Sequence, residues 1–187
     1  PTNPAQTTVV NENFSSGSGG FTYQDNLYGG TGSDADGGRV NAGQGGNNGA
    51  LHLDLGEGNT SRTNMNGGFQ RTFDLATAGI VAVSFSYRVQ LSGQTDNGDD
   101  VKVLARIDGS NLDSDGFVHE LKGVSNTNVA QDSGWVTVTY NVQLGAGSHT
   151  LDLGGLMTAK DANNEYADID FDNVAVKVTP NVFANGS

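Results

Sequence analysis

Apolar and polar residues alternate along much of the chain with the two-residue period of a β-strand. The clearest case is IVAVSFSYRVQL (80–91), in which every second side chain from the first valine onward is apolar or aromatic. The same alternation recurs in 51–55, 101–107 and 136–144, and no helical period is visible in the sequence. The pattern predicts an all-β fold of about nine or ten strands: an antiparallel β-sandwich of jelly-roll type, with a β-barrel as the alternative.

One strand, EYADIDFDNVAV, departs from regular alternation. Asp168, Asp170 and Asp172 point to one side of it, and Val174 then falls on that same side. We therefore expect a β-bulge between Phe171 and Val174, which re-aims the side chains that follow. The first half of the strand then faces a site at the rim of the sandwich and the second half faces the core. The simpler alternative is an edge strand whose charges face water.

Arg71 is a possible partner for the aspartates of this strand, because it shares a strand face with Phe69 and Phe73. A half-buried arginine needs a carboxylate partner. Alternate strand positions lie several ångströms apart, so Glu165 and the three aspartates of the acidic strand cannot all bind one ion. We expect them to divide between two neighbouring sites, or between one ion and Arg71.

Charge narrows the choice of partner. The 187 residues carry 21 acidic against 9 basic side chains, which gives a net charge of −12 and a pI near 4.3. Such a surface disfavours nucleic acid and anionic membranes as partners. The 28 glycines indicate many tight turns, and the absence of cysteine excludes disulfides, thiolate metal sites and cysteine nucleophiles.

The chain length suits one domain, which we place at 11–179, with linkers at 1–10 and 180–187. No apolar run is long enough to span a membrane, so we expect no membrane insertion. The opening PTNPAQTT resembles a linker and not a signal peptide. We therefore expect a monomeric module cut from a longer chain that is extracellular or on a bacterial cell surface.

Aspartate and asparagine concentrate in four long loops, at 24–49, 92–100, 108–116 and 157–168. Loops of this length are functional or disordered. Ca²⁺ takes roughly six to eight oxygen ligands, which short Asp side chains on Gly-rich turns supply. The stretches DNGDD, DSDG and DADGG each offer adjacent or alternating carboxylates. We therefore expect loops ordered by several Ca²⁺ ions.

The sequence contains no strong match to a catalytic motif. His52, His119 and His149 are far apart in sequence and lack the spacing of a metal site, so we expect half-exposed strand residues at all three. A paired-carboxylate glycosidase site lacks aromatic-rich surroundings. We expect no enzyme activity. Trp135 is either a sugar platform or a cap of the sandwich, whereas Tyr23 in the first acidic loop is better placed to touch a ligand.

Several segments taken in order resemble a known group: NMNGGFQRTFDLATAGIVAVSFSY, DDVKVLARIDGS, DSGWVTVTYNVQLGAGSHTLDLGG and NEYADIDFDNVAV. Over roughly 11–178 the chain resembles β-sandwich ligand-binding modules of large, calcium-dependent, RTX-type bacterial adhesins. It is also similar to carbohydrate-binding modules of secreted polysaccharide-degrading enzymes. The first resemblance implies a non-catalytic domain, stabilised by several Ca²⁺ ions, that holds peptides or glycans on another cell surface during attachment and biofilm formation.

Carried over residue by residue, Asp99, Asp100, Glu165 and Asp172 match acidic positions of that pattern, whereas Asp170 departs from it. The alternatives to an adhesin module are a carbohydrate-binding module of a secreted enzyme and a structural spacer stiffened by calcium. The expected calcium ligands are Glu12, Asp99, Asp100, Asp113, Asp115, Glu165, Asp168, Asp170 and Asp172. The residues expected to contact a ligand are Tyr28, Asp34, Asp36 and Tyr166.

Overall fold

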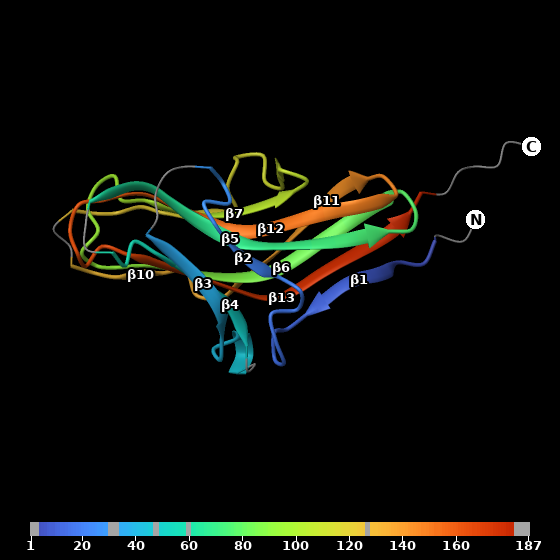
Figure 1. The fold of residues 1–187 in the computed structure, drawn as a ribbon, viewed down its shortest axis with the longest axis horizontal. Coiled ribbons are helices and arrows are strands. Elements are labelled where there is room, and N and C mark those ends of the chain that lie inside the picture. Colours follow the sequence, from blue (N-terminus) through green and yellow to red (C-terminus); the bar gives the residue numbers. More distant parts are fainter. Residues whose placement is uncertain (1–3, 30–33, 47–48, 59–60, 126–127, 182–187) are drawn as a thin grey trace, which may run out of the picture.

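A computed structural model describes residues 4–29, 34–46, 49–58, 61–125 and 128–181. Two antiparallel sheets pack face to face in it (Figure 1), which confirms the predicted β-sandwich. The first sheet contains β1 (Thr7–Glu12), β3 (Ala35–Val40), β4 (Ala50–Leu55), β6 (Gly79–Leu91), β10 (Gln131–Asp132), β11 (Val136–Leu144) and β13 (Ala167–Pro180). The second contains β2 (Thr22–Asp25), β5 (Arg62–Leu75), β7 (Val101–Ile107), β8 (Ser110–Asn111), β9 (His119–Leu121) and β12 (Gly147–Lys160).

Strand order places β13 at the centre of the first sheet, in the path β10-β6-β13-β4-β3, with β1 also paired to β13 and β11 to β6. The second sheet runs β2-β5-β12-β7-β8, with β9 also paired to β7. The described residues form 13 strands where the sequence predicts about nine or ten. β3 lies within 24–49, so the expectation of one long loop there is wrong. β8, β9 and β10 are pairings of only two or three residues within loops. β1 begins at Thr7, inside the range for which the sequence predicts a linker.

The core lies between the sheets and consists of the inward-facing residues of each alternating strand. Every second residue of β6 from Val81 to Leu91 is buried. Phe85 lies near the centre, edge-on to Phe171 at 6.1 Å between ring centroids and stacked on Tyr140 at 6.3 Å. Burial of this continuous apolar layer provides the main driving force for the fold.

The predicted bulge in β13 is present. The ladder with β6 runs in register to the pair Asp172–Ser86, shifts, and resumes at Ala175–Ser84. Asn173 adopts a left-handed conformation at this point, with φ 51°. Val174 then points into the core. The phase change seen in the sequence is therefore a real change in the facing of the strand.

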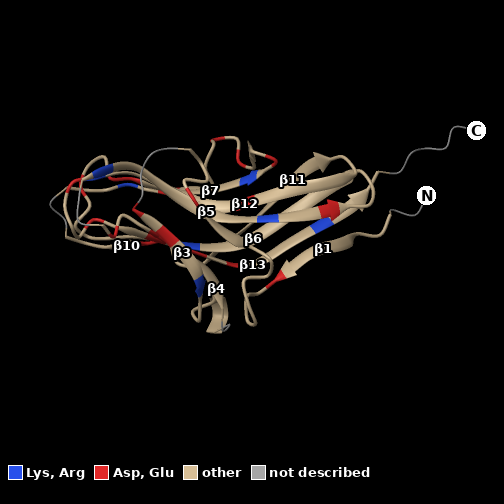
Figure 2. Ribbon diagram, in the orientation of Figure 1, with Lys and Arg blue, Asp and Glu red and all other residues tan. Residues whose placement is uncertain are grey.

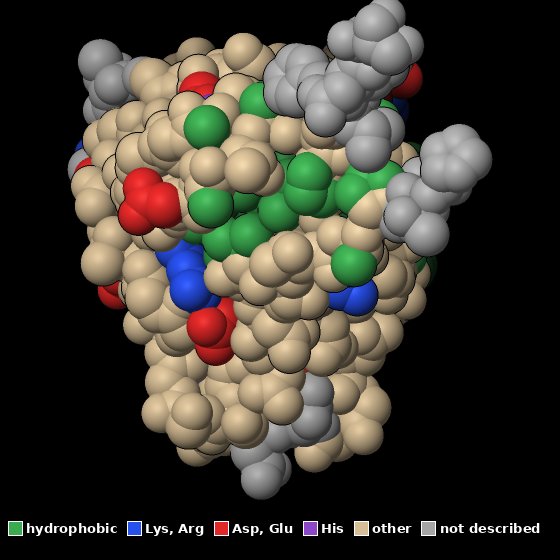
Figure 3. Space-filling model, turned by 90° about the vertical axis from the view of Figure 1, so that its right-hand side faces the viewer, with side chains coloured by type: hydrophobic (Ala, Val, Ile, Leu, Met, Phe, Trp, Pro, Cys, Tyr) green, Lys and Arg blue, Asp and Glu red, His purple; other side chains and the backbone are tan. Residues whose placement is uncertain are grey.

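The two ends of the sandwich differ in character. Acidic residues are frequent at the end that carries the 92–100 and 161–166 loops, on the left in Figure 2. β1 begins and β13 ends at the opposite end, where a band of hydrophobic side chains is visible in Figure 3. Within the described residues, no helix has the length and apolar character needed to cross a bilayer. The acidic loops therefore lie away from the points where the chain enters and leaves the domain.

Candidate functional site

A cluster of four carboxylates occupies the acidic end of the sandwich. Asp96 and Asp99 come from the loop between β6 and β7, whereas Asp161 and Glu165 come from the turn between β12 and β13. Asp96, Asp161 and Glu165 each offer an oxygen atom, and these atoms lie within 4.8 Å of one another. The charges of Glu165, Asp96 and Asp161 all act on Asp99. We call these four residues the rim cluster.

Burial makes the rim cluster electrostatically costly. Asp99 is 4% exposed and Glu165 is 2% exposed. Burial, and then the negative charges around it, raise the pKa of Asp99 from 3.8 to about 6. Glu165 Oε2 accepts hydrogen bonds from the backbone N–H groups of Asp161 at 2.6 Å and Ala162 at 2.7 Å. Both hydrogen bonds go to one oxygen of Glu165 and come from the turn that carries Asp161.

No basic side chain in the described part of the chain forms an ion pair with the rim cluster. Lys160 is next to Asp161 in sequence, but its buried ammonium donates to the carbonyl oxygens of Gly56 and Gly58 instead. Oxygen donors in excess of protein cations are what Ca²⁺ selects. The cluster therefore offers the donor type and the negative charge that a calcium site needs.

The rim cluster opens onto a pocket of about 540 Å³, a volume within the range of small-ligand sites. Three segments line it: the start of β5, the 96–99 loop and the end of β12. Arg62 provides a positive charge in the lining, with its side chain 41% exposed. A ligand in this pocket can therefore contact the cluster and a guanidinium together.

A second group of charges lies on the outer face of the first sheet. In register across β4 and β13, His52 opposes Asp170 and Asp54 opposes Asp168. His52 Nδ1 is 2.7 Å from Asp170 Oδ1, and His52 Nε2 is 3.0 Å from Asp54 Oδ1. The hydrogen bond with Asp170 raises the pKa of His52 from 6.5 to about 9, and burial raises the pKa of Asp168 to about 6. His52, Asp54, Asp168 and Asp170 therefore form a coupled network, which we call the sheet cluster.

Asp34 and Asp36, predicted to contact a ligand, lie beside the sheet cluster. Asp36 pairs with Asp54 in the β3–β4 ladder. Together with Asp54 and Glu57 they line a pocket of about 190 Å³. Asp34 Oδ2 is 3.7 Å from Arg62 Nε, so Arg62 lies between this pocket and the larger one.

Two predicted metal ligands have partners within the protein. Arg71 Nη1 donates to Glu12 Oε1 at 2.7 Å, which confirms that Arg71 needs a carboxylate and identifies Glu12 as that carboxylate. The alternative in which Arg71 pairs with the β13 aspartates is wrong, because its ion-pair partner is Glu12 at the end of β1. Asp172 is fully buried and accepts hydrogen bonds from the backbone N–H groups of Gln44 and Asn173 at 2.8 and 2.6 Å. The acidic strand thus places Asp168 and Asp170 in the sheet cluster and Asp172 in a separate, buried environment, and the predicted division between two metal sites stays a prediction.

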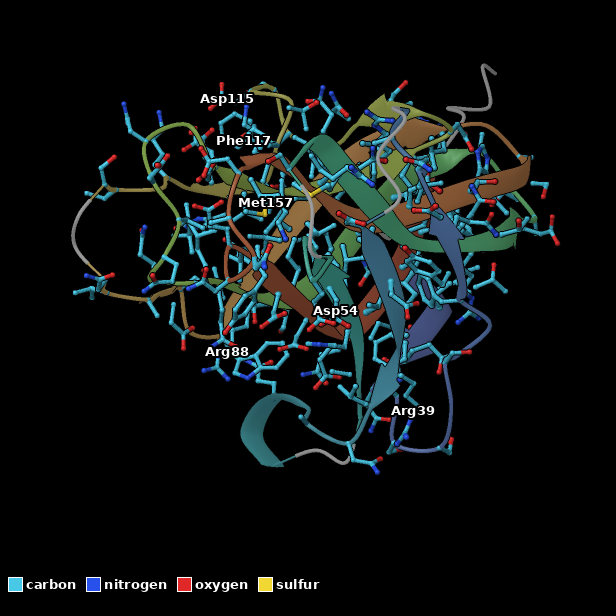
Figure 4. All side chains as sticks on the ribbon, turned by 60° about the vertical axis from the view of Figure 1, so that its left-hand side comes forward. Arg39, Asp54, Arg88, Asp115, Phe117 and Met157 are labelled. Carbon is cyan, nitrogen blue, oxygen red and sulfur yellow. The ribbon has the colours of Figure 1, made fainter. Side chains whose placement is uncertain are left out.

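Asp100, Asp113 and Asp115 lie outside both clusters. Asp100 Oδ1 accepts from the Gly123 N–H at 3.2 Å. Asp113 accepts from the Tyr140 hydroxyl at 3.0 Å and from the Asp115 N–H at 2.9 Å, which closes a local turn. Asp115 is exposed in the 108–116 loop, well apart from Asp54 in Figure 4. A metal role for these three residues stays a prediction that no cluster in the described residues supports.

Tyr28 and Tyr166, both predicted to contact a ligand, differ in their surroundings. Tyr28 packs below the guanidinium of Arg106, 4.4 Å from its ring centroid, and donates its hydroxyl to the Leu104 carbonyl at 3.4 Å. Tyr166 follows Glu165 and is 41% exposed. Tyr166 is the better placed of the two for ligand contact at the acidic end.

Sequence reasoning missed Asp96, Asp161, His52 and Asp54 as site residues. Asp96 lies in the DNGDD stretch and Asp161 in the last acidic loop, so the local signal for both was present. His52 and Asp54 carry no such signal, because their partners on β13 lie more than a hundred positions away in the chain. The three histidines are half-buried strand residues, as predicted.

Comparison with known proteins yields distant structural neighbours. No family model matches the chain, and no curated protein matches it. The chain is similar to the K3 cleaved adhesin domain of Lys-gingipain from Porphyromonas gingivalis, with 13% identity, a TM-score of 0.45 and coverage of 92% of this chain and 99% of that one. It is similar to a carbohydrate-binding module with specific mannan recognition, at 13% identity, a TM-score of 0.44 and coverage of 93% and 98%. It is also similar to a family 35 carbohydrate-binding module from Clostridium thermocellum, with 13% identity, a TM-score of 0.40 and coverage of 92% of this chain and 97% of that one. At these TM-scores the likeness decides neither the ligand nor the site of this chain.

Proposed function

We propose that this chain is a non-catalytic, calcium-dependent ligand-binding domain of a large bacterial surface adhesin, and that it holds peptides or glycans of another cell during attachment. The observation that carries the proposal is the rim cluster: four carboxylates, two of them almost fully buried, converge beside a pocket without a protein cation among them. A Ca²⁺ ion bound there would neutralise the repulsion and order both loops.

The position of the rim cluster supports a role in contact with another cell. It lies at the end of the sandwich away from the start of β1 and the end of β13, so a chain that continues beyond the domain would present it outward (Figure 1). An extracellular location also suits calcium dependence, because millimolar Ca²⁺ outside cells would keep a weak site filled.

The charge of the protein constrains the ligand. A domain with a net charge of −12 repels acidic partners unless a cation mediates the contact. A calcium ion with a coordination position facing the pocket can accept a carboxylate or vicinal hydroxyl groups, and Arg62 can pair with a second anionic group. Tyr166 is the one aromatic residue exposed among the described residues, which favours capture through the cation over stacking on an aromatic platform.

Calcium-dependent stability and binding test the proposal together. Wild-type protein should melt at a markedly higher temperature in millimolar Ca²⁺ than in EDTA, since each site contributes about 2.7 kcal/mol at 100 times its Kd. Binding to peptide and glycan arrays should require Ca²⁺ and disappear in EGTA. Glu165→Gln should lose both effects, whereas Asp74→Asn, which removes one exposed acid on β5, should keep both.

Binding that persists in EGTA would exclude calcium from recognition. An array without hits in Ca²⁺, combined with a normal thermal shift, would instead support the structural spacer. Selective binding to polysaccharide without any peptide would support the carbohydrate-binding module of a secreted enzyme.

A further inference from the structure

His52 has one carboxylate at each ring nitrogen, and a third carboxylate lies within reach. Nδ1 contacts Asp170, and Nε2 contacts Asp54 two residues further along β4. Asp168 stands directly opposite Asp54 in the β4–β13 ladder. Ligand atoms of His52, Asp54 and Asp168 all lie within 4.8 Å of one another. One nitrogen and two carboxylate donors therefore surround a common position on the outer face of the sheet.

Asp170 has a different part in this arrangement. It is 8% exposed, and its Oδ1 lies 2.7 Å from His52 Nδ1. Histidines that bind metals commonly donate the other ring N–H to a carboxylate, which sets the tautomer and the orientation of the ring. With the Nδ1 proton held by Asp170, the lone pair of Nε2 points toward Asp54 and Asp168 in the neutral ring.

Asp54 and Asp168 bring two carboxylates to the same position. The two residues pair directly across the β4–β13 ladder, so their carboxylates lie close together on the outer face of the sheet. A dication bound between them would offset the repulsion of two neighbouring carboxylates.

We propose that His52 Nε2, Asp54 and Asp168 form a binding site for a transition-metal dication of the zinc class, with Asp170 as the residue that positions His52. A nitrogen donor beside two carboxylates suits Zn²⁺ or Co²⁺, whereas Ca²⁺ takes oxygen donors only. The side chains of His52 and Asp54 are 26% and 27% exposed, so the remaining coordination position faces solvent. This site goes beyond the proposed calcium function, since its donors, its cation and its place on the sheet all differ from those of the rim cluster.

His149 provides an internal comparison. Its Nδ1 lies 2.7 Å from Asp108 Oδ2, the same contact that His52 makes with Asp170. Its Nε2, however, lies 3.0 Å from the backbone carbonyl of Gly145, and no group of three potential metal donors among the described residues includes His149. A carboxylate–histidine pair alone is thus common to both sites, and only the His52 site has the additional donors.

Cobalt binding in the presence of millimolar Ca²⁺ tests this proposal. Wild-type protein should take up one equivalent of Co²⁺ with visible d–d absorption, and Zn²⁺ should displace it. His52→Gln should lower the Co²⁺ affinity about 100-fold, and Asp170→Asn about 10-fold to 100-fold. His149→Gln should leave the affinity within about twofold of wild type. Absence of stoichiometric uptake by wild-type protein, equal losses in His52→Gln and His149→Gln, or complete displacement by Ca²⁺ would each overturn it.

A measurement on the wild-type protein keeps the test independent of whether His52→Gln folds. The chain has only three histidines, so their ring resonances can be followed individually by NMR. Substoichiometric Co²⁺ should broaden the His52 ring signals before those of His119 and His149. Equal broadening of all three, or earlier broadening of His149, would place the metal elsewhere and refute the site.

Discussion

Asp99→Asn should have opposite effects on stability with and without calcium. Asp99 is 4% exposed, and its pKa is raised from 3.8 to about 6 by burial and by the negative charges of the rim cluster. A carboxyl whose pKa is higher in the folded state than in the unfolded state loses stabilising free energy as pH rises between those two values. At pH 7 the ionised side chain therefore costs the calcium-free fold at most about 3 kcal/mol, at about 1.4 kcal/mol per pH unit.

Asparagine keeps the shape of the side chain and the oxygen that accepts the Asp96 N–H at 2.9 Å, but removes the charge. In EDTA at pH 7, Asp99→Asn should therefore be more stable than wild type, by up to about 3 kcal/mol. Near pH 4 the gain should vanish, because the wild-type carboxyl is then protonated in the fold. In millimolar Ca²⁺ the order should reverse if Asp99 is a ligand of the proposed calcium site, since the variant would lack one charged ligand.

Urea denaturation at pH 4 and pH 7, each in EDTA and in Ca²⁺, measures all four free energies of unfolding. Two results would refute the reasoning. The first is an Asp99→Asn variant that is destabilised in EDTA at pH 7 as much as at pH 4, which would mean that the charge is not repelled by its neighbours. The second is an equal calcium stabilisation of variant and wild type, which would remove Asp99 from the calcium site.

Three further predictions concern the rest of the domain. The pKa of His52 is raised from 6.5 to about 9 by its carboxylate partners, so protonated His52 should add roughly 2 kcal/mol to the free energy of unfolding. This stabilisation should be complete below pH 6.5 and disappear as pH rises through 9. Urea denaturation in EDTA should show this loss in wild type but not in His52→Gln. Glu12→Gln should cost about 1–3 kcal/mol in the same assay, because it removes the carboxylate at 2.7 Å from the half-buried Arg71; a loss below about 0.5 kcal/mol would mean that the pair is solvated. Gly154→Ala should cost on the order of 2 kcal/mol or more in thermal melts, since its Cβ would lie 2.2 Å from the backbone oxygen of Gly67, whereas Gly17→Ala, with open space around its Cβ, should be nearly neutral.

Local pattern was sufficient to predict most strands and the bulge. Alternation in 80–91 predicts a strand that the structure places at Gly79–Leu91, because side-chain facing in a strand depends only on position modulo two. The odd spacing between Phe171 and Val174 likewise predicts the break at Asn173. β3 was missed because its sequence ADGGRV has no regular apolar alternation. β8 and β10 were missed because each consists of two residues, and no period can be read from so few.

The carboxylates of the rim cluster were predicted only in part, because their meeting depends on contacts between distant segments of the chain. The sequence shows that DNGDD and the last acidic loop are rich in carboxylates, but not that Asp96 and Glu165 meet. Their meeting depends on β6 pairing with β13 along a ladder that brings the two loops to one end of the sandwich. Loop ends of neighbouring strands converge only once the strand order is set.

By itself, the sequence determined the fold class, the acidic character of the loops and the change of facing in the acidic strand, since each depends on neighbouring residues along the chain. The tertiary structure alone decided which charges meet: Glu12 with Arg71, His52 with Asp168 and Asp170, and Glu165 with the 96–99 loop. These contacts are set by strand order and by register. Both follow from packing the whole apolar layer, and a one-residue slip of β13 against β4 would separate both cross-strand pairs of the sheet cluster.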